Sequence, residues 1–398
     1  MDKRGTFLTY TYTEEFPLEQ GGTLPGITIA YHTYGRLNEK RDNCIWVCHA
    51  LTANSDVADW WPHTVVPDGF LDPEKYFIVC ANIIGSCYGS TGPLSINPET
   101  GEPWYDAFPK LTIRDMVKAH SLLADHLGIF SIFSLLGSSV GGFQAFEWAI
   151  TEPHRFKSMV LIATAPYASP WAIAIDETQR MTIFADHTYG EKRADAARQG
   201  LSAARAIALL TYRGARGYNL TQQDIHSPED GVPTYHRACS YQKYQGEKLV
   251  KRFDAYSYVA ILDAFDTHNV GRGRNGIQAA LRRVDFPVVC VGITSDIIFT
   301  PEEMISFTSF FPNAKYREIS SQFGHDGFLV EHSLLNTIIK DFYNSLPFTP
   351  ELPKELSDEE PEDEKKRRKS KTKRARRKDD PEDPHPQLPV TPNIPIPE

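Results

Sequence analysis

The stretch Leu135-Leu136-Gly137-Ser138-Ser139-Val140-Gly141-Gly142 joins an apolar run to a helical pattern through a Gly-x-Ser-x-Gly motif. A serine in this setting lies on a sharp strand-to-helix turn that exposes its hydroxyl at the edge of a sheet. Glycines flank the serine because larger side chains would collide with the neighbouring strand and helix. The stretch predicts that Ser139 is a nucleophile for covalent acyl chemistry. A simple Gly/Ser turn after a buried strand fits the motif equally well, so its surroundings decide.

Apolar runs alternate with helical patterns on both sides of this motif. Continuous apolar runs at 44–49, 76–81 and 159–163 are typical of strands buried on both faces of a parallel sheet. Between Ile113 and Leu127 the apolar residues follow helical spacing. This alternation predicts an α/β fold with a mostly parallel sheet flanked by helices.

The alternation stops between about Pro170 and Phe286, where helical patterns occur without a convincing strand. We interpret this part as a helical lid insertion that covers the carboxyl edge of the sheet, where ligands bind in α/β folds. Strands resume at Pro287, and a final helix is expected from about Gly327 to Leu346. The expected organisation is a core in two parts, the lid between them and a tail: 1–169, 170–286, 287–348 and 349–398.

Composition excludes several classes of protein. The 398 residues carry a formal net charge of −9, which argues against a folded body that binds nucleic acid. Neither a signal peptide nor a membrane-spanning run is expected from the apolar pattern. The six cysteines lack Cys-x-x-Cys spacing, so reduced cysteines in a cytoplasmic protein are expected, with no metal site and no disulfide framework.

The expected tail, 349–398, is rich in Pro, Glu, Asp and Lys. Its basic block, 365–378, is flanked by acidic runs that cancel the charge. Such a segment buries too little apolar surface to fold, so we expect it to be disordered. An RNA-binding or localisation patch is the alternative interpretation of the basic block.

A nucleophilic serine needs a base, and the base needs a carboxylate to orient it. In α/β-hydrolase folds these groups follow in the chain order Ser, Asp or Glu, His. Asp296 follows the strand expected after Pro287, and His325 follows the last expected strand. We therefore expect His325 to accept the proton of Ser139, and Asp296 to fix the imidazole tautomer and stabilise the imidazolium.

The negatively charged oxygen of a tetrahedral intermediate needs backbone N–H donors. One is expected from Val140, directly after the nucleophile. The other is expected from Leu51, in the loop after the early strand 44–49.

Long motifs in the chain resemble the homoserine O-acetyltransferases of methionine biosynthesis, over roughly residues 10–345. The segments that carry the resemblance are 49–52 (His-Ala-Leu-Thr), 82–93, 95–98, 111–117, the serine motif, 143–149 and 244–248. The resemblance implies an α/β-hydrolase fold and a cytoplasmic homodimer formed through the helical lid. It also implies ping-pong transfer of an acetyl group from acetyl-CoA, as co-substrate, to homoserine through Ser139, without a bound cofactor or metal.

The same resemblance implies residues that bind homoserine. Arg205 is suited to a bidentate grip on the substrate carboxylate, and Asp326 is expected to pair with the substrate ammonium. Tyr212 and Thr52 are expected to line the pocket. Ordinary surface or packing roles are the alternatives for Arg205 and Tyr212.

The chain departs from the family at its serine motif, where Ser138 and Val140 replace the usual glycine and methionine. The backbone N–H of Val140 is intact, but a β-branched side chain beside the nucleophile can change the acyl pocket. The acyl donor, acetyl or succinyl, is therefore left open. Homoserine or serine as acceptor is also left open, because the two differ by only a few pocket contacts. An ester or thioester hydrolase and a non-catalytic binding protein of the same fold are the competing interpretations.

Overall fold

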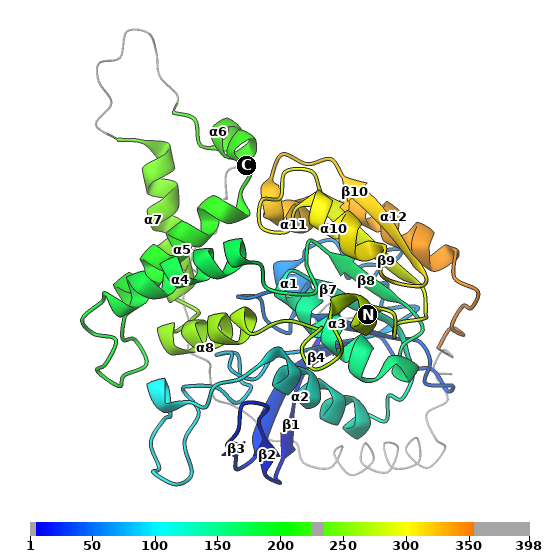
Figure 1. Ribbon diagram of the computed structural model, residues 1–398, viewed down its shortest axis with the longest axis horizontal. Coiled ribbons are helices and arrows are strands. Elements are labelled where there is room, and N and C mark those ends of the chain that lie inside the picture. Colours follow the sequence, from blue (N-terminus) through cyan, green and yellow to red (C-terminus); the bar gives the residue numbers. More distant parts are fainter. Residues whose placement is uncertain (1–4, 225–234, 354–398) are drawn as a thin grey trace, which may run out of the picture. The chain divides into compact units, whose positions relative to one another are not determined.

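An eight-stranded sheet forms the centre of the protein in this computed structural model, which describes residues 5–224 and 235–353 (Figure 1). The strand order is β1-β4-β6-β5-β7-β8-β9-β10. Strand β4 is antiparallel to both of its neighbours, and all strand pairs from β6 to β10 are parallel. The bounds are β1 (Thr6–Tyr12), β4 (Ile27–Tyr34), β5 (Cys44–Cys48), β6 (Phe77–Ala81), β7 (Ile132–Ser138), β8 (Met159–Ile162), β9 (Val288–Ile293) and β10 (Ala314–Ile319). Two further strands, β2 (Phe16–Pro17) and β3 (Thr23–Leu24), pair separately.

Helices cover both faces of the sheet, which makes the central strands apolar on both sides. Helices α2 (Ile113–His126), α3 (Val140–Thr151) and α10 (Pro301–Thr308) pack on the face that carries Trp46. Helix α12 (His332–Asn344) packs on the opposite face, with Val47. The mostly parallel sheet flanked by helices confirms the expected fold class.

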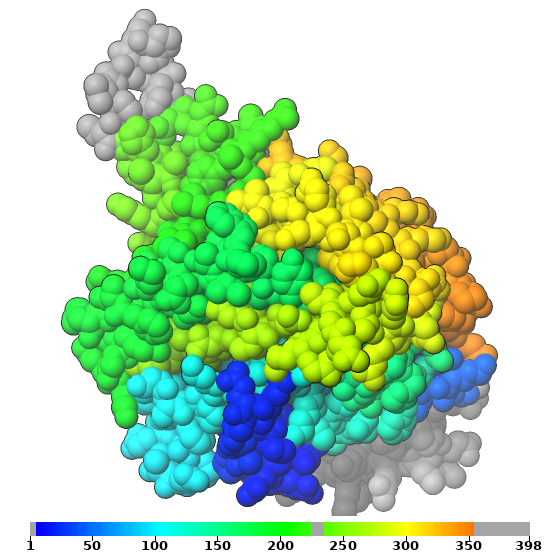
Figure 2. Space-filling view, in the orientation of Figure 1, coloured from blue at the N-terminus to red at the C-terminus, as the bar shows by residue number. Residues whose placement is uncertain are grey.

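Helices fill the chain between β8 and β9. They are α4 (Pro170–Phe184), α5 (Arg198–Tyr212), α6 (Ala215–Thr221), α7 (Arg237–Val250), α8 (Ala255–Asp266) and α9 (Ile277–Leu281), and no strand occurs in 170–224 or 235–286. In the space-filling view the green surface of this helical segment meets the yellow surface of the chain after β9 (Figure 2). Within the described ranges, no helix is long and apolar enough to cross a membrane.

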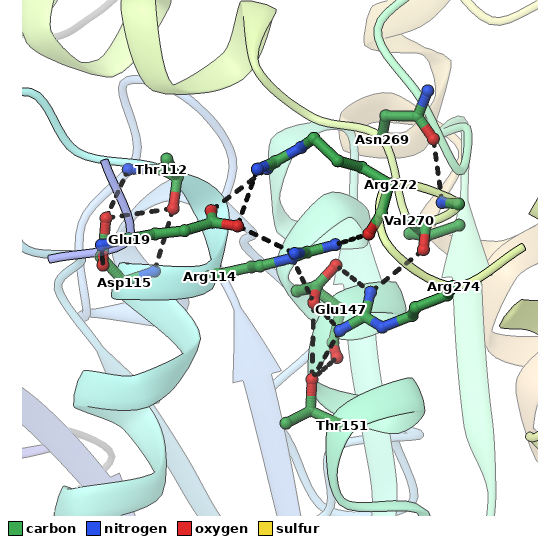
Figure 3. Close-up of polar contacts among 11 residues, drawn as sticks. Glu19, Thr112, Arg114, Asp115, Glu147, Thr151, Asn269, Val270, Arg272 and Arg274 are labelled. Atoms are coloured by element: carbon green, nitrogen blue, oxygen red, sulfur yellow. Dashed lines mark hydrogen bonds and ion pairs between the residues drawn. The ribbon is translucent and has the colours of Figure 1, made fainter. Parts of the chain in front are cut away.

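A cluster of arginines joins the end of the helical segment to the core (Figure 3). Glu147 of α3 pairs with the two Nη atoms of the Arg274 guanidinium, and its Oε1 lies 3.0 Å from Nε of Arg114. Glu19 accepts from Arg114 Nη1 at 2.8 Å and from Arg272 Nη1 at 2.7 Å. We call these five residues the arginine clamp, because they hold the loop after α8 against α2 and α3.

The expectation of a single final helix from Gly327 to Leu346 is wrong: α11 (Gly327–Val330) ends at Val330, Glu331 is not helical, and α12 begins at His332. The Phe328 carbonyl accepts a hydrogen bond from Trp61 Nε1 at 2.8 Å instead of continuing the helix. Edge strand β1 was not foreseen. The expected tail lies outside the described residues from 354 onward.

All six cysteines are free thiols in the structure. Cys44, Cys48, Cys80 and Cys290 are buried in the central strands, where burial raises the pKa of each thiol. They behave as small core residues.

Candidate active site

Ser139 lies between β7 and α3 with a φ of +54°, a backbone conformation that L-residues rarely adopt. The neighbouring glycines make this turn possible. A Cβ on Gly137 would lie 2.3 Å from the Gly141 carbonyl oxygen, and a Cβ on Gly141 would lie 2.0 Å from the Cys48 carbonyl oxygen. The carbonyl of Ser139 is fixed by the hydroxyl of Thr164 at 2.8 Å. The turn presents the Ser139 hydroxyl to the space above the sheet.

The structure brings Ser139, His325 and Asp296 together in hydrogen-bonding order. Nε2 of His325 lies 2.9 Å from Oγ of Ser139, and Nδ1 of His325 lies 2.7 Å from Oδ2 of Asp296. The other Asp296 oxygen accepts from the backbone N–H groups of Ile298 and Phe299 at 2.8 and 3.1 Å. The arrangement suits a serine nucleophile, a histidine base and a carboxylate that orients the base.

Electrostatics favour His325 as a proton acceptor that holds its proton firmly. Burial alone would lower the pKa of His325, but the charge of Asp296 and the hydrogen bond to it outweigh burial and raise the pKa. The raised pKa means that the imidazolium form of His325, which arises when Ser139 gives up its proton, is stabilised by Asp296.

The loops that carry Asp296 and His325 are tied to each other by Ser295. Its hydroxyl donates to the Ser321 carbonyl at 2.7 Å and accepts from the Gly324 N–H at 2.8 Å. Ser295 could not be selected from the sequence, because a serine beside an acidic residue does not indicate partners almost thirty positions away in the chain. The tie fixes the spacing between base and carboxylate.

A cavity opens beside Ser139. It is mostly apolar, with four polar side chains, and is lined by Leu51, Ser139, Val140, Ala172, Ile175, Asp176, Tyr212, Phe265, Ile298, Phe299 and His325. Both residues expected to supply backbone donors, Leu51 and Val140, therefore border the same space as the nucleophile.

The loop that carries Leu51 is held by a neutral histidine. Burial lowers the pKa of His49 to about 4, so its Nε2 is free to accept the N–H of Ile83 at 3.1 Å. Gln144 of α3 donates to the His49 carbonyl at 3.3 Å. These bonds fix the loop relative to the helix that begins at the nucleophile.

Of the residues expected to bind substrate, Tyr212 lines the cavity, whereas Arg205 and Asp326 are not among the lining residues. The ring of Tyr212 lies 5.8 Å from that of His325, and the half-buried Arg205 lies over the Tyr212 ring at 5.6 Å. Asp326 is buried, and its Oδ2 lies 2.8 Å from Nε of Arg213. Burial raises the pKa of Asp326, although the charges of Arg213 and Arg205 oppose that shift.

Thr52 is not among the residues that border the cavity. Its carbonyl accepts hydrogen bonds from Arg252 and, at 3.5 Å, from the Tyr88 hydroxyl. Asp176 does border the cavity, although sequence analysis did not select it, because nothing in its helical context distinguishes it from a surface acid.

The fold and the serine–histidine–aspartate geometry define a protein of the alpha/beta hydrolase fold, whose family model matches residues 44–332. Two curated relatives cover most of the chain, and both are homoserine O-acetyltransferases. The one from Cyclobacterium marinum is 42% identical and covers 83% of this chain and 93% of the relative. The one from Chloroherpeton thalassium is 41% identical and covers 83% and 87%. The chain belongs to the homoserine O-acetyltransferase family.

Solved structures with the same fold include transferases and esterases. The homoserine O-acetyltransferase from Bacillus anthracis matches with a TM-score of 0.78 at 23% identity, covering 87% of this chain and 99% of the other. Esterase E22 matches with a TM-score of 0.77 at 20% identity, covering 85% and 100%. At these identities the likeness concerns the fold alone.

Proposed function

We propose that this protein transfers an acetyl group from acetyl-CoA to the hydroxyl of L-homoserine and so produces O-acetyl-L-homoserine for methionine biosynthesis. The observation that carries the proposal is the hydrogen-bonded Ser139–His325–Asp296 arrangement beside a small cavity. Its support is the family membership, with relatives about 40% identical over most of the chain.

In the first half of the reaction, Ser139 attacks the thioester carbonyl while Nε2 of His325 takes the serine proton. The N–H groups of Leu51 and Val140 stabilise the negatively charged oxygen of the tetrahedral intermediate. The carbon–sulfur bond then breaks, and His325 gives the proton to the departing CoA thiolate. Ser139 is left as an acetyl ester.

In the second half, the homoserine hydroxyl gives its proton to His325 and attacks the acetyl ester. The bond to the Ser139 oxygen breaks, and His325 returns the proton to that oxygen. Asp296 holds the imidazole in the tautomer that both halves require. Arg205 holds the homoserine carboxylate. Asp326 pairs with the homoserine ammonium and gives up part of its contact with Arg213. Tyr212 shapes this end of the pocket, and Thr52, which does not border the cavity, acts only through the loop that also carries Leu51.

Water competes with homoserine for the acetyl ester. We propose that residues 170–286 act as a lid, inserted between the core segments 1–169 and 287–348, that limits access of water to Ser139. Support comes from Ala172, Ile175, Tyr212 and Phe265, which the helical segment contributes to the cavity wall.

The test is release of free CoA thiol from acetyl-CoA, with and without L-homoserine. Release that depends on homoserine is expected. Equal release in both conditions would identify a thioesterase, and release from succinyl-CoA alone would identify a succinyltransferase. L-Serine in place of homoserine serves as the matched acceptor control, since the two differ by one methylene group.

A hydrolase is the second candidate, because esterase E22 matches the fold as well as the transferase structures do. Arg205→Ala separates the two functions. In a transferase it raises the KM for homoserine about 10- to 100-fold, the loss of a charge-assisted hydrogen bond. The control is Arg216→Ala, an exposed arginine of α6. An unchanged KM in Arg205→Ala would favour the hydrolase.

A cytoplasmic homodimer formed through the helical segment is part of the proposal. Its support is a group of large apolar side chains exposed on α4 and α5: Trp171, Met181, Phe184 and Leu210. Light scattering of the purified protein tests it. A dimer that Met181→Glu converts to a monomer is expected, and a wild-type monomer would contradict it.

A further inference from the structure

A carboxyl group that the mechanism does not use borders the cavity beside the nucleophile. Asp176 of α4 is only 6% exposed and lines the same space as Ser139 and His325. Its Oδ1 accepts from Gln179 Nε2 at 3.1 Å. Its Oδ2 is buried and receives no hydrogen bond from an N–H or hydroxyl group among the described residues. An oxygen in this position is costly unless it serves a ligand or another group.

Behind Asp176 lies a cluster in which acids outnumber their cation. Arg180 contacts Asp266 at 2.5 Å, Glu177 at 2.8 Å and Asp263 at 3.5 Å. Burial, followed by the charge of Asp266, raises the pKa of Asp176 well above its usual range, and burial also raises the pKa of Asp266. One proton held between these two carboxyls still leaves more negative than positive charge around Arg180.

Acyl groups of the same length but different charge meet different surroundings at this wall of the cavity. An uncharged acyl chain meets Ile175, Phe265 and other apolar side chains of the wall. A chain that ends in a carboxylate meets a buried carboxyl instead, and the nearby Arg180 is already engaged by three acids. Although Asp176 shares a proton with Asp266, the cluster of acids around Arg180 keeps a net negative charge, and this charge repels a second carboxylate where water is excluded.

We propose that Asp176 determines the acyl specificity of the site: it admits small uncharged acyl groups to Ser139 and rejects those that end in a carboxylate. The proposal rests on the proposed function only in requiring an acyl ester on Ser139. It selects an acetyl over a succinyl donor, a choice that the sequence left open.

The experiment measures acylation of Ser139 without CoA and without an acceptor. The probes are 4-nitrophenyl acetate, 4-nitrophenyl butyrate and 4-nitrophenyl hemisuccinate, and the readout is kcat/KM for nitrophenolate release. Butyrate and hemisuccinate both have four acyl carbons, so their ratio isolates charge from length. The variants are Asp176→Asn, which keeps the shape of the side chain, and the control Asp263→Asn, which contacts the same arginine but does not border the cavity.

The wild type is expected to react about tenfold faster, or more, with the butyrate than with the hemisuccinate. Asp176→Asn is expected to shrink that preference about tenfold, and Asp263→Asn is expected to keep the wild-type preference. Equal wild-type rates with the two four-carbon esters would overturn the proposal. So would a preference unchanged in Asp176→Asn, or a wild type that accepts only the acetate, since length would then be the limit.

Failure of the proposed function gives a different result. A protein that hydrolyses acetyl-CoA equally with and without homoserine, yet shows the expected ester ratios, retains the specificity role of Asp176 and loses only the transferase assignment. A wild type that none of the three esters acylates would overturn the specificity role.

Discussion

The active site has two halves that treat their carboxyl groups in opposite ways. At the sheet edge, both oxygens of Asp296 accept hydrogen bonds, and both ring nitrogens of His325 have partners. In the helical half, Asp176 Oδ2 and Asp266 Oδ1 are buried without an N–H or hydroxyl donor among the described residues, and the two carboxyls share a proton with each other instead. Fully partnered groups hold one geometry, which proton transfer requires, whereas the acid-rich wall shapes the potential that a ligand meets. The difference teaches that precise positioning and selectivity come from different elements of this fold.

The largest expected effect comes from breaking the partnered half. Asp296→Asn leaves the backbone contacts of the loop possible but presents an amide to Nδ1 of His325, which disfavours the required tautomer. We expect kcat to fall about 10⁴-fold. The measurement is CoA release with homoserine, and the control is Asp341→Asn, an exposed acid on α12. A loss smaller than about tenfold would mean that Asp296 only shapes its loop.

A smaller effect comes from the arginine clamp, which ties the loop after α8 to α2 and α3 (Figure 3). Glu147 is fully buried, and Glu147→Gln leaves Arg114 and Arg274 without their shared carboxylate. We expect the free energy of unfolding to fall by about 3 kcal/mol. Denaturant unfolding measures it.

Asp266→Asn is the matched comparison for Glu147→Gln, since it removes an acid from a cluster with an excess of acids. We expect Asp266→Asn to lower the free energy of unfolding by less than Glu147→Gln does, because Arg180 keeps its contacts with Glu177 and Asp263. Equal losses in the two variants would show that the charge balance of the clusters does not govern their stability.

The acid-rich half also predicts how stability depends on pH. The pKa of Asp176 is raised by folding, so the unfolded chain releases this proton at lower pH than the folded protein does. The protonated Asp176 carboxyl therefore adds to the free energy of unfolding. This contribution is fully present below about pH 4 and is lost as the pH rises toward the pKa of the folded protein, by at most about 1.4 kcal/mol per pH unit. Asp176→Asn lacks this contribution.

The measurement is the free energy of unfolding of wild type and Asp176→Asn from pH 4.5 to 7. We expect the stability of the wild type relative to the variant to decline as pH rises. A difference that is constant or grows in favour of the wild type would show that Asp176 ionises as easily folded as unfolded.

The sequence was sufficient for the central parallel strands and for the loops at their carboxyl ends, but not for edge strand β1. Apolar runs and the glycine spacing around Ser139 follow local rules, and the carboxyl ends of parallel strands meet at one edge. The order of Ser139, Asp296 and His325 therefore predicted side chains that the structure brings together. The break at Glu331 was missed because it depends on a hydrogen bond from Trp61, far away in the chain.

By itself the sequence determined the fold class, the family and the residues at the turn and the strand ends, since these rest on local spacing and long motifs. Only the tertiary structure decided which partners those residues have. Arg213 reaches Asp326, Ser295 ties two loops, and Asp176 faces the cavity with Asp266 behind it. The reason is physical: burial and neighbouring charge act through space, and residues close in space here come from segments far apart in the sequence.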